Sequence, residues 1–506
     1  MADTGILERI RRQWAKADEW PPSHVKKRWD EIEGYRERYE NDRATLIQKN
    51  PNLAINNHMV ETFVPVGWAR ELCRFSAALL FSDTPQVTLN GKATGPDLEA
   101  LLRVNDFGAT SIRAGIKTAC EGRIALRIIR DTDIHPTSPL ITIVPEDQVV
   151  WDIRHGSFYA GGMVIIERVR DKGTRQEKTY RLLEEHTRGL VTRTLYEGST
   201  RSLGKPVPLK TVAEFAELVP VEETGLDRPT LVPWENIPGA ESDLFGMGPL
   251  LDELNEAETL LLDRLRKSIP RVFVDRSLAD ETGRLEIDGY ILTGGTRMRM
   301  PLGQTPSSTV EVATPGLLSA EHIAALDHIQ QLMVTVAGYS PLTWGIQGQT
   351  ASVTRAVSGY AMKLAQLRTL LTRSAKEHMA LEALGHATAV ALCWASKQHE
   401  VHDFLPKIEL GDGLPDDPLD GAQEVLFLRQ AMAASTETRV KTVHPTWTDA
   451  QVEAEADAIT EAGMFPPGAG QGQGVGNLGK NVRDLLRASE NDPRAGAGSD
   501  PAPDAS

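Results

Sequence analysis

The sequence is poor in three features that often reveal the class of a protein: cysteine, long apolar runs and positive charge. Only three cysteines occur among 506 residues, namely Cys73, Cys120 and Cys393. This number excludes a disulfide framework and a zinc site built on paired cysteines, and it fits a reducing compartment. The most apolar stretch, 379–395, is interrupted by Glu382 and His386. We therefore expect no membrane-spanning helix, and the first residues show no signal-peptide pattern.

Negative charge dominates the chain. Lys and Arg total 55 against 70 Asp and Glu, which gives a net charge of −15 at pH 7. Such a protein lacks the overall attraction for phosphates on which most DNA-binding proteins depend, so any contact with DNA is expected to be local and weak. The apolar residues, 41% of the chain, suffice for a large core, which excludes a wholly disordered protein.

Helical and β-type periodicities follow one another in the first half of the chain. A charged helix is predicted over 23–41, and an amphipathic one within 57–81, where Pro65 suits a first helical turn and 82–85 ends the helix. From 124 to 196 the period changes to two, which predicts an antiparallel β region. The runs rich in Val, Ile and aromatic residues, each predicted to be a strand, are 124–129, 140–144, 149–153, 163–169 and 190–196.

Two predicted helices, each with an apolar stripe along one face, flank a β-type insertion in the middle of the chain. The first is predicted over 246–268, with leucines at helical spacing, acidic residues early and basic residues late, as the helix dipole favours. The second covers 319–338. If the two helices are antiparallel neighbours, the insertion 269–318 is held away from the body on a two-helix stalk. The alternative is an ordinary α+β core with a loop excursion.

The segment that follows the second helix, 339–352, is polar, uncharged and contains glycine. Trp344 offers a ring for stacking, and Gln347, Gln349 and Thr350 offer uncharged hydrogen-bonding groups. Such a loop could touch DNA without sequence preference and without holding it. A plain connection between two helices is the alternative.

The last third of the chain begins with a helix of unusual predicted length, 352–396, which contains no proline. The composition then becomes acidic, with helical segments expected at 421–432 and 448–463. From 466 onward the sequence is rich in Gly, Gln and Pro, which predicts a disordered tail.

No pattern makes a positive case for catalysis. The run 474–480 has the glycine and lysine spacing of a phosphate loop, but Asn481 stands where a magnesium-binding Ser or Thr is needed, and no buried strand precedes the run. The run 399–403 contains two histidines, whose spacing does not place both on one face of a helix as zinc ligation requires. We therefore expect no cofactor, no metal and no enzymatic activity.

The order of these elements resembles that of the portal proteins of tailed double-stranded-DNA bacteriophages, of the siphophage type. Four stretches are similar to the family: the early helix and its turn at 57–87, the paired strands at 121–126 and 144–149, and the entry into the first striped helix at 246–255. The resemblance implies an α+β, portal-like fold. It would have a β-rich wing, a two-helix stem, a small β-containing clip, a long wing helix and a helical, crown-like C-terminal region.

By this resemblance the chain divides into eight regions. They are an N-terminal wing (1–245), a first stem helix (246–268), a clip (269–318), a second stem helix (319–338), a channel loop (339–352), a long wing helix with the strand that follows (353–410), a crown-like helical region (411–465) and a disordered tail (466–506). Trp344, Gln347, Gln349 and Thr350 would line the channel, and Arg284, Arg297 and Arg299 of the clip would contact partners.

The function that the resemblance implies is that of a passive channel. A homo-oligomeric ring, of twelve subunits, would occupy one vertex of the capsid after assembly in the host cytoplasm, and double-stranded DNA would pass through it during packaging and ejection. Its protein partners would be the terminase large subunit, the major capsid and scaffolding proteins, and a head-completion or tail-adaptor protein; no membrane contact is expected. Two alternatives stay open, namely another capsid-associated structural or adaptor protein and an ATPase built on 474–480.

Overall fold

The computed structural model has a mixed helix-and-sheet, α+β architecture. It describes residues 19–50, 57–89, 96–158, 161–170, 178–267, 271–274, 286–287, 290–291, 310–313, 319–345, 359–411, 426, 435–443 and 449–461. The chain divides into two compact units, Met1–Gly413 and Leu414–Ser506. None of the described helices combines the length and the apolar character that a bilayer crossing requires.

The first unit begins with a series of helices, which precede most of its strands. They are α2 (Ser23–Glu40), α3 (Arg43–Lys49), α5 (Asn57–Thr62), α6 (Trp68–Phe81), α7 (Pro96–Val104) and α8 (Phe107–Glu121). The charged helix predicted over 23–41 is α2, and the turn predicted at 82–85 does end α6. Neither α7 nor α8 was predicted from the sequence.

The helix expected within 57–81 is two helices, because the chain is extended around Pro65. Proline disfavours helical backbone in the residue before it and cannot donate a hydrogen bond. The neighbouring N–H groups donate instead to side chains of α9 (Gly248–Lys267). Val64 donates to Oγ1 of Thr259 (3.1 Å), and Val66 donates to Oδ1 of Asn255 (2.7 Å). Pro65 therefore belongs to the link between α5 and α6, and the expectation that it opens the helix is wrong.

Two antiparallel sheets form the β part of the first unit. Three strands, β2 (Arg123–Ile129), β3 (Leu140–Pro145) and β10 (Leu231–Glu235), pair in the order β10-β2-β3. The larger sheet has the order β4-β5-β6-β7-β8, with β9 also on β7. Its strands are β4 (Val149–Trp151), β5 (Gly162–Arg170), β6 (Lys178–Thr187), β7 (Leu190–Ser199), β8 (Ser202–Val207) and β9 (Val221–Glu223). The predicted antiparallel β region is confirmed.

The long helix predicted over 352–396 is α11 (Gly359–Ala395), a single helix of 37 residues. Its C-terminal half is rich in alanine and lies in the main core beside α6, β2 and β10, with Trp234 and Trp394 among the buried side chains. The next elements are a 3-10 turn, η8 (Val401–Phe404), and β15 (Lys407–Glu409), which pairs with β1 (Gln86–Thr88).

Close packing between α6 and α8 gives a first testable prediction. A Cβ on Gly115 would lie 2.9 Å from Cε2 of Phe81 and 3.3 Å from Cβ of Ala77. We expect Gly115→Ala to lower the free energy of unfolding by about 1–2 kcal/mol, because overpacking outweighs the gain in helix propensity. Denaturant titration measures this, and a variant as stable as the wild type would contradict the packing. The matched control is Gly34→Ala on α2, where the nearest atom lies 3.7 Å away and a small gain is expected.

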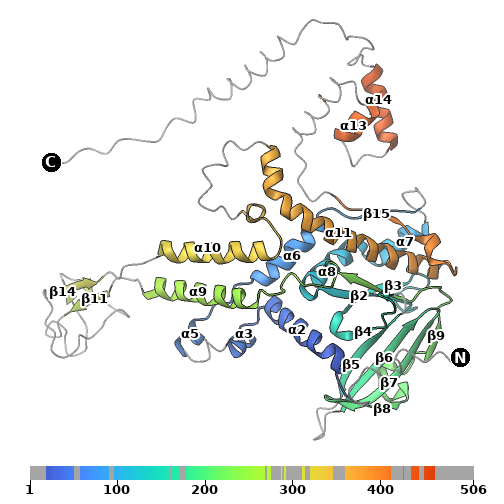
Figure 1. The fold of residues 1–506 in the computed structure, drawn as a ribbon, viewed down its shortest axis with the longest axis horizontal. Helices are drawn as coiled ribbons and strands as arrows, with labels where there is room; N and C mark the ends of the chain where they lie inside the picture. Colours follow the sequence, from blue (N-terminus) through green and yellow to red (C-terminus); the bar gives the residue numbers. More distant parts are fainter. Residues whose placement is uncertain are drawn as a thin grey trace. The chain divides into compact units, whose positions relative to one another are not determined.

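The two striped helices form a stalk. They are α9 (Gly248–Lys267) and α10 (Ser319–Val336), which pack against each other. Figure 1 shows them side by side, with β11 (Arg271–Val274) and β14 (Val310–Ala313) beyond their far ends. These two strands pair antiparallel, and β12 (Glu286–Ile287) pairs with β13 (Tyr290–Ile291). The insertion therefore has a β-type pattern in its described part; the strand expected over 297–300 lies outside the described residues.

The second unit contains α13 (Thr436–Val443) and α14 (Asp449–Glu461), which pack through Val440, Val452 and Ala456. The helix predicted over 448–463 is α14, whereas α13 was not predicted. Of the helix expected over 421–432, only residue 426 lies in the described part, where it is helical.

Candidate functional site: the stalk and the junction at its base

The stalk is held together by an apolar seam between its two helices. Leu251, Leu254 and Leu261 of α9 belong to the same buried cluster as Leu326 and Met333 of α10. Further out, the guanidinium of Arg264 donates to the imidazole of His322, which links the helices near the strands. Because the seam runs along both helices, the stalk is a packed pair that positions β11 and β14 beyond its end.

A buried lysine joins four segments at the base of the stalk. The side chain of Lys376, in α11, is only 3% exposed. Its ammonium donates to both carboxylate oxygens of Asp243 (2.6 Å each), to Oγ of Ser76 (2.7 Å) and to the hydroxyl of Tyr339 (2.8 Å). These partners come from the approach to α9, from α6 and from the end of α10. We call Ser76, Asp243, Tyr339 and Lys376 the base network.

Burial and charge set the protonation of this network. Burial alone would lower the pKa of Lys376, but the carboxylate of Asp243 and the hydroxyl of Tyr339 outweigh it and raise that pKa. Burial and the same carboxylate raise the pKa of Tyr339 to about 12. The lysine is therefore charged and the tyrosine neutral over the physiological range. Every member is buried, so the network holds the four segments together and is not accessible to a substrate.

The chain that leaves α10 is fastened to α11 before the predicted channel loop begins. Gly338 ends α10 with φ +84°, and its carbonyl accepts a hydrogen bond from Oγ1 of Thr372 (2.7 Å). The N–H of Ser340 donates to Oγ1 of Thr369 (2.9 Å), which also lies 3.0 Å from Oγ1 of Thr343. These bonds attach the start of the loop to one face of α11.

Trp344 is partly buried and packs against α6. Its ring stacks on Trp68 with centroids 4.9 Å apart and an interplanar angle of 25°, and it lies 4.5 Å from the ring of Phe75. Its indole N–H is buried and has no hydrogen-bond partner among the described residues. The sequence predicts a ring offered for stacking on DNA, whereas the structure uses the ring to hold the loop onto α6. A DNA contact by Trp344 stays a prediction.

The first residues of the predicted channel loop, 339–344, are attached to the body of the first unit. Tyr339 and Ser340 are buried, and Pro341–Trp344 forms a 3-10 turn, η6. Part of the polar character of this stretch is used within the protein, because the N–H of Ser340 and the hydroxyl of Thr343 bond to Thr369 of α11. Of the other candidates, Gln347, Gln349 and Thr350 in the loop and Arg284, Arg297 and Arg299 in the insertion lie outside the described residues, as does the run 474–480.

Sequence reasoning missed the base network entirely. Helical spacing could have indicated that Lys376 is buried. It lies seven residues after the buried Thr369 and four before the buried Ala380, which places it on the buried face of α11. Ser76 carries the same signal, four residues after the buried Leu72 and four before the buried Leu80 of α6, whereas Asp243 carries none. The contacts of both with α11 depend on the tertiary fold.

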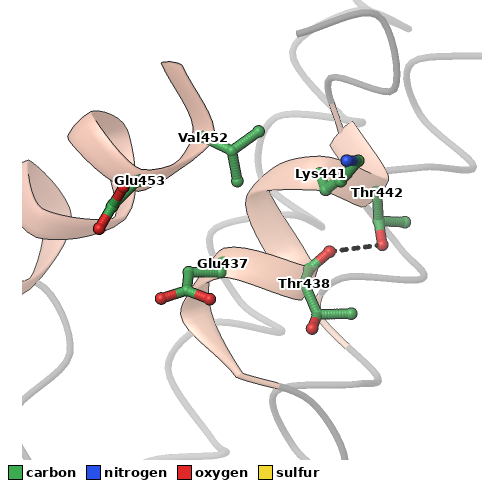
Figure 2. Close-up of a pocket in the computed structure, with 6 residues that line it drawn as sticks. All are labelled: Glu437, Thr438, Lys441, Thr442, Val452 and Glu453. Atoms are coloured by element: carbon green, nitrogen blue, oxygen red, sulfur yellow. Dashed lines mark hydrogen bonds between the residues drawn. The ribbon is translucent and has the colours of Figure 1, made fainter. Parts of the chain in front are cut away.

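The hollow between α13 and α14 is the other candidate that we considered. Figure 2 shows its lining, which includes Glu437, Lys441 and Glu453. Nothing there arranges a nucleophile with a base. Across the described ranges, no group of three His, Cys, Asp or Glu side chains is placed to hold a metal ion. The candidate functional site is therefore the stalk with its base.

Comparison with known proteins gives no family for the chain. No protein-family model matches the sequence, and a search of curated proteins finds no significant match. The function must therefore be argued from the residues and their arrangement.

Proposed function

We propose that this protein is a portal protein. Several copies form a ring at one capsid vertex, and the genome passes through the central channel during packaging and ejection. The observation that carries the proposal is the stalk: two packed antiparallel helices, α9 and α10, hold a β-containing segment beyond the body, and the chain then returns directly into a loop and a 37-residue helix. This is the element order of the family that the sequence resembles.

The base network supports a mechanical role for the stalk. A segment that docks a packaging motor and later a tail adaptor must be held firmly while DNA moves past it. Lys376 ties the approach to α9 and the end of α10 to α6 and α11 through four hydrogen bonds. The 269–318 segment, with Arg284, Arg297 and Arg299, would be the docking site for the terminase large subunit and for the head-completion protein. Capsid and scaffolding proteins would contact the body.

A channel must centre DNA without binding it tightly. Each phosphate that a protein neutralises strengthens binding and steepens its dependence on salt. A protein of net charge −15 with uncharged Gln347, Gln349 and Thr350 in its loop would keep the duplex coaxial and let it slide. The protein is then a passive conduit in the virion, and ATP hydrolysis belongs to the terminase.

Microscopy of the purified or co-expressed protein tests the proposal directly. We expect closed rings with a sharp rotational symmetry in end-on views, because a head-to-tail contact closes only when its rotation divides the circle. Monomers or open assemblies, even in the presence of capsid and scaffolding proteins, would contradict the proposal and favour another capsid-associated protein.

The loop supplies a functional test. We expect Gln347→Lys combined with Gln349→Lys to slow packaging and to make its rate depend on salt, since each new phosphate contact adds about 0.9 to the slope of log K against log salt. The matched control replaces both residues by Asn, which preserves the charge. Packaging rates that stay equal to the wild type across a salt series would count against a channel role for this loop.

A further inference from the structure

Large apolar side chains are exposed around the base of the stalk. They are Phe245, Leu332, Val336, Leu367 and Leu371, each between 41% and 63% exposed. We call this set the collar. Soluble proteins rarely leave a contiguous apolar surface uncovered unless something binds there.

The hydrogen bonds at the base bring the three segments of the collar together. Phe245 is two residues after Asp243, whose carboxylate is bound by Lys376 of α11. Val336 is two residues before Gly338, whose carbonyl is bound by Thr372 of α11. Leu371 directly precedes Thr372. The three segments that carry the collar therefore meet at the base of the stalk in the first unit.

The collar has two helical halves of matching geometry. Leu332 and Val336 on α10 are four residues apart, and so are Leu367 and Leu371 on α11. Side chains at this spacing form a ridge on a helix, and such ridges are the units by which two helices pack. Each half is thus suited to receive a helix, and among the residues that the structure describes no helix covers either half.

The charges beside the two halves have opposite sign. On α11, the exposed Arg368 lies between Leu367 and Leu371 in sequence. On the stalk, the exposed Glu253 of α9 follows Leu251 and precedes Leu254, which pack in one cluster with Met333 and Val334 of α10. Glu253 lies near the start of α9, and Leu332 and Val336 lie near the end of α10, so all three are in the part of the stalk nearest its base. A contact that joins unlike halves brings Arg368 toward Glu253, whereas a two-fold contact between like α11 halves would bring Arg368 toward its own copy.

We propose that the collar is the contact between neighbouring copies of this chain, with the α10 half of one copy packed on the α11 half of the next. The inference rests on the proposed ring, because a contact between two different surfaces of the same chain closes only around a rotation axis. Its position at the base network means that each copy would support the stalk of its neighbour.

Cysteine cross-linking tests the contact. The native cysteines Cys73, Cys120 and Cys393 are all buried, so an introduced surface cysteine is the reactive one under native conditions. Leu332→Cys protein is mixed with Leu371→Cys protein and treated with a short bismaleimide. We expect a cross-linked dimer from the mixture and none from either variant alone, while the double variant gives a ladder of multimers. The control is Ile153→Cys, which is 49% exposed and should not cross-link with either.

The outcomes separate this inference from the proposed function. Rings in micrographs without a 332–371 cross-link overturn the contact and leave the channel proposal standing. Dimers from either single variant alone show a two-fold contact and also overturn it. Monomers without any cross-link contradict both. A charge test adds a second arm: Arg368→Glu is expected to lower the ring yield at least tenfold, and Glu253→Arg in the same chain to restore it. Failure of Glu253→Arg to restore the yield would count against the pairing of unlike halves.

Discussion

Replacing Lys376 by methionine is expected to lower the free energy of unfolding by about 3–5 kcal/mol, since it leaves the carboxylate of Asp243 buried without its counter-ion. The ammonium is the shared partner of Asp243, Ser76 and Tyr339, so one substitution removes every bond that crosses the base of the stalk to α11 within the base network. Denaturant titration of the full chain measures the loss.

Two further variants make the lysine result interpretable. The double variant Lys376→Met with Asp243→Asn should be more stable than Lys376→Met alone, because no uncompensated charge stays buried. Lys407→Met is the matched control, since that side chain is 75% exposed and its loss should cost within about 0.5 kcal/mol. Equal stability of Lys376→Met and Lys407→Met would contradict the buried network.

The pH dependence of the lysine effect has a defined sign. The pKa of Lys376 is raised in the folded protein, so its stabilisation is fully present below the pKa of an unfolded lysine, about 10.4. It is lost as the pH rises through the folded value. We therefore expect a constant stability difference between wild type and Lys376→Met from pH 7 to 9, and a shrinking one above about pH 10.4. A difference that already falls between pH 7 and 9 would show that the lysine is not charged as the structure has it.

Replacing Trp344 by alanine is expected to cost about 3 kcal/mol, the low end for a tryptophan because the residue is only partly buried. The substitution removes the stack on Trp68 and the contact with Phe75. Hydrogen exchange should rise in residues 338–345, because the aromatic contacts fix the start of the loop to α6. Denaturant titration and exchange measured by mass spectrometry provide the two readouts.

The matched control for this effect is Trp344→Phe. Phenylalanine keeps an aromatic ring against Trp68 and removes the buried indole N–H, which has no partner in the described part of the chain. An unpaired buried donor is unfavourable, so the variant should lose much less stability than Trp344→Ala. If both variants lost the same free energy of unfolding, the indole N–H would be making a stabilising hydrogen bond, and the prediction would be wrong.

Periodic elements of this protein were predictable, and elements with buried polar residues were not. The strands with alternating apolar residues and the helices α9, α10 and α11 follow from spacing alone. Helix α8 was missed because Ser111 and Thr118 lie on its buried face. Their hydroxyls donate to the carbonyls of Phe107 (2.8 Å) and Ala114 (2.7 Å), one turn earlier in the same helix. A search for apolar stripes does not recognise buried polar side chains whose hydrogen bonds are made within their own helix.

Strand β6 was missed for a related reason. Its buried face carries Glu184 and His186, which interrupt the apolar alternation. Glu184 is paired with Arg127 of β2 (2.7 Å) and Arg193 of β7 (2.9 Å). Although burial opposes it, these arginines and His186 lower the pKa of Glu184, so the carboxylate is charged within the sheet. The sequence contains these charges, but only the tertiary fold shows which ones meet.

The candidate site was predictable in outline and not in detail. The stalk helices and the β-type insertion followed from periodicity, whereas the base network and the inward position of Trp344 depend on contacts between residues far apart in the chain. Lys376 and Ser76 are 300 residues apart, a separation that no local pattern encodes.

The glycine that ends α10 has a mechanical consequence. A Cβ on Gly338 would lie 2.8 Å from Oγ1 of Thr372, and the hydroxyl of Thr372 is itself bonded to the Gly338 carbonyl. The end of α10 therefore lies directly against the middle of α11. A side chain at position 338 would push the end of α10 away from α11, because it would meet Thr372 and would also be strained at a positive φ. The angle at which the stalk leaves the first unit is thus set in part by the absence of a side chain at this one position.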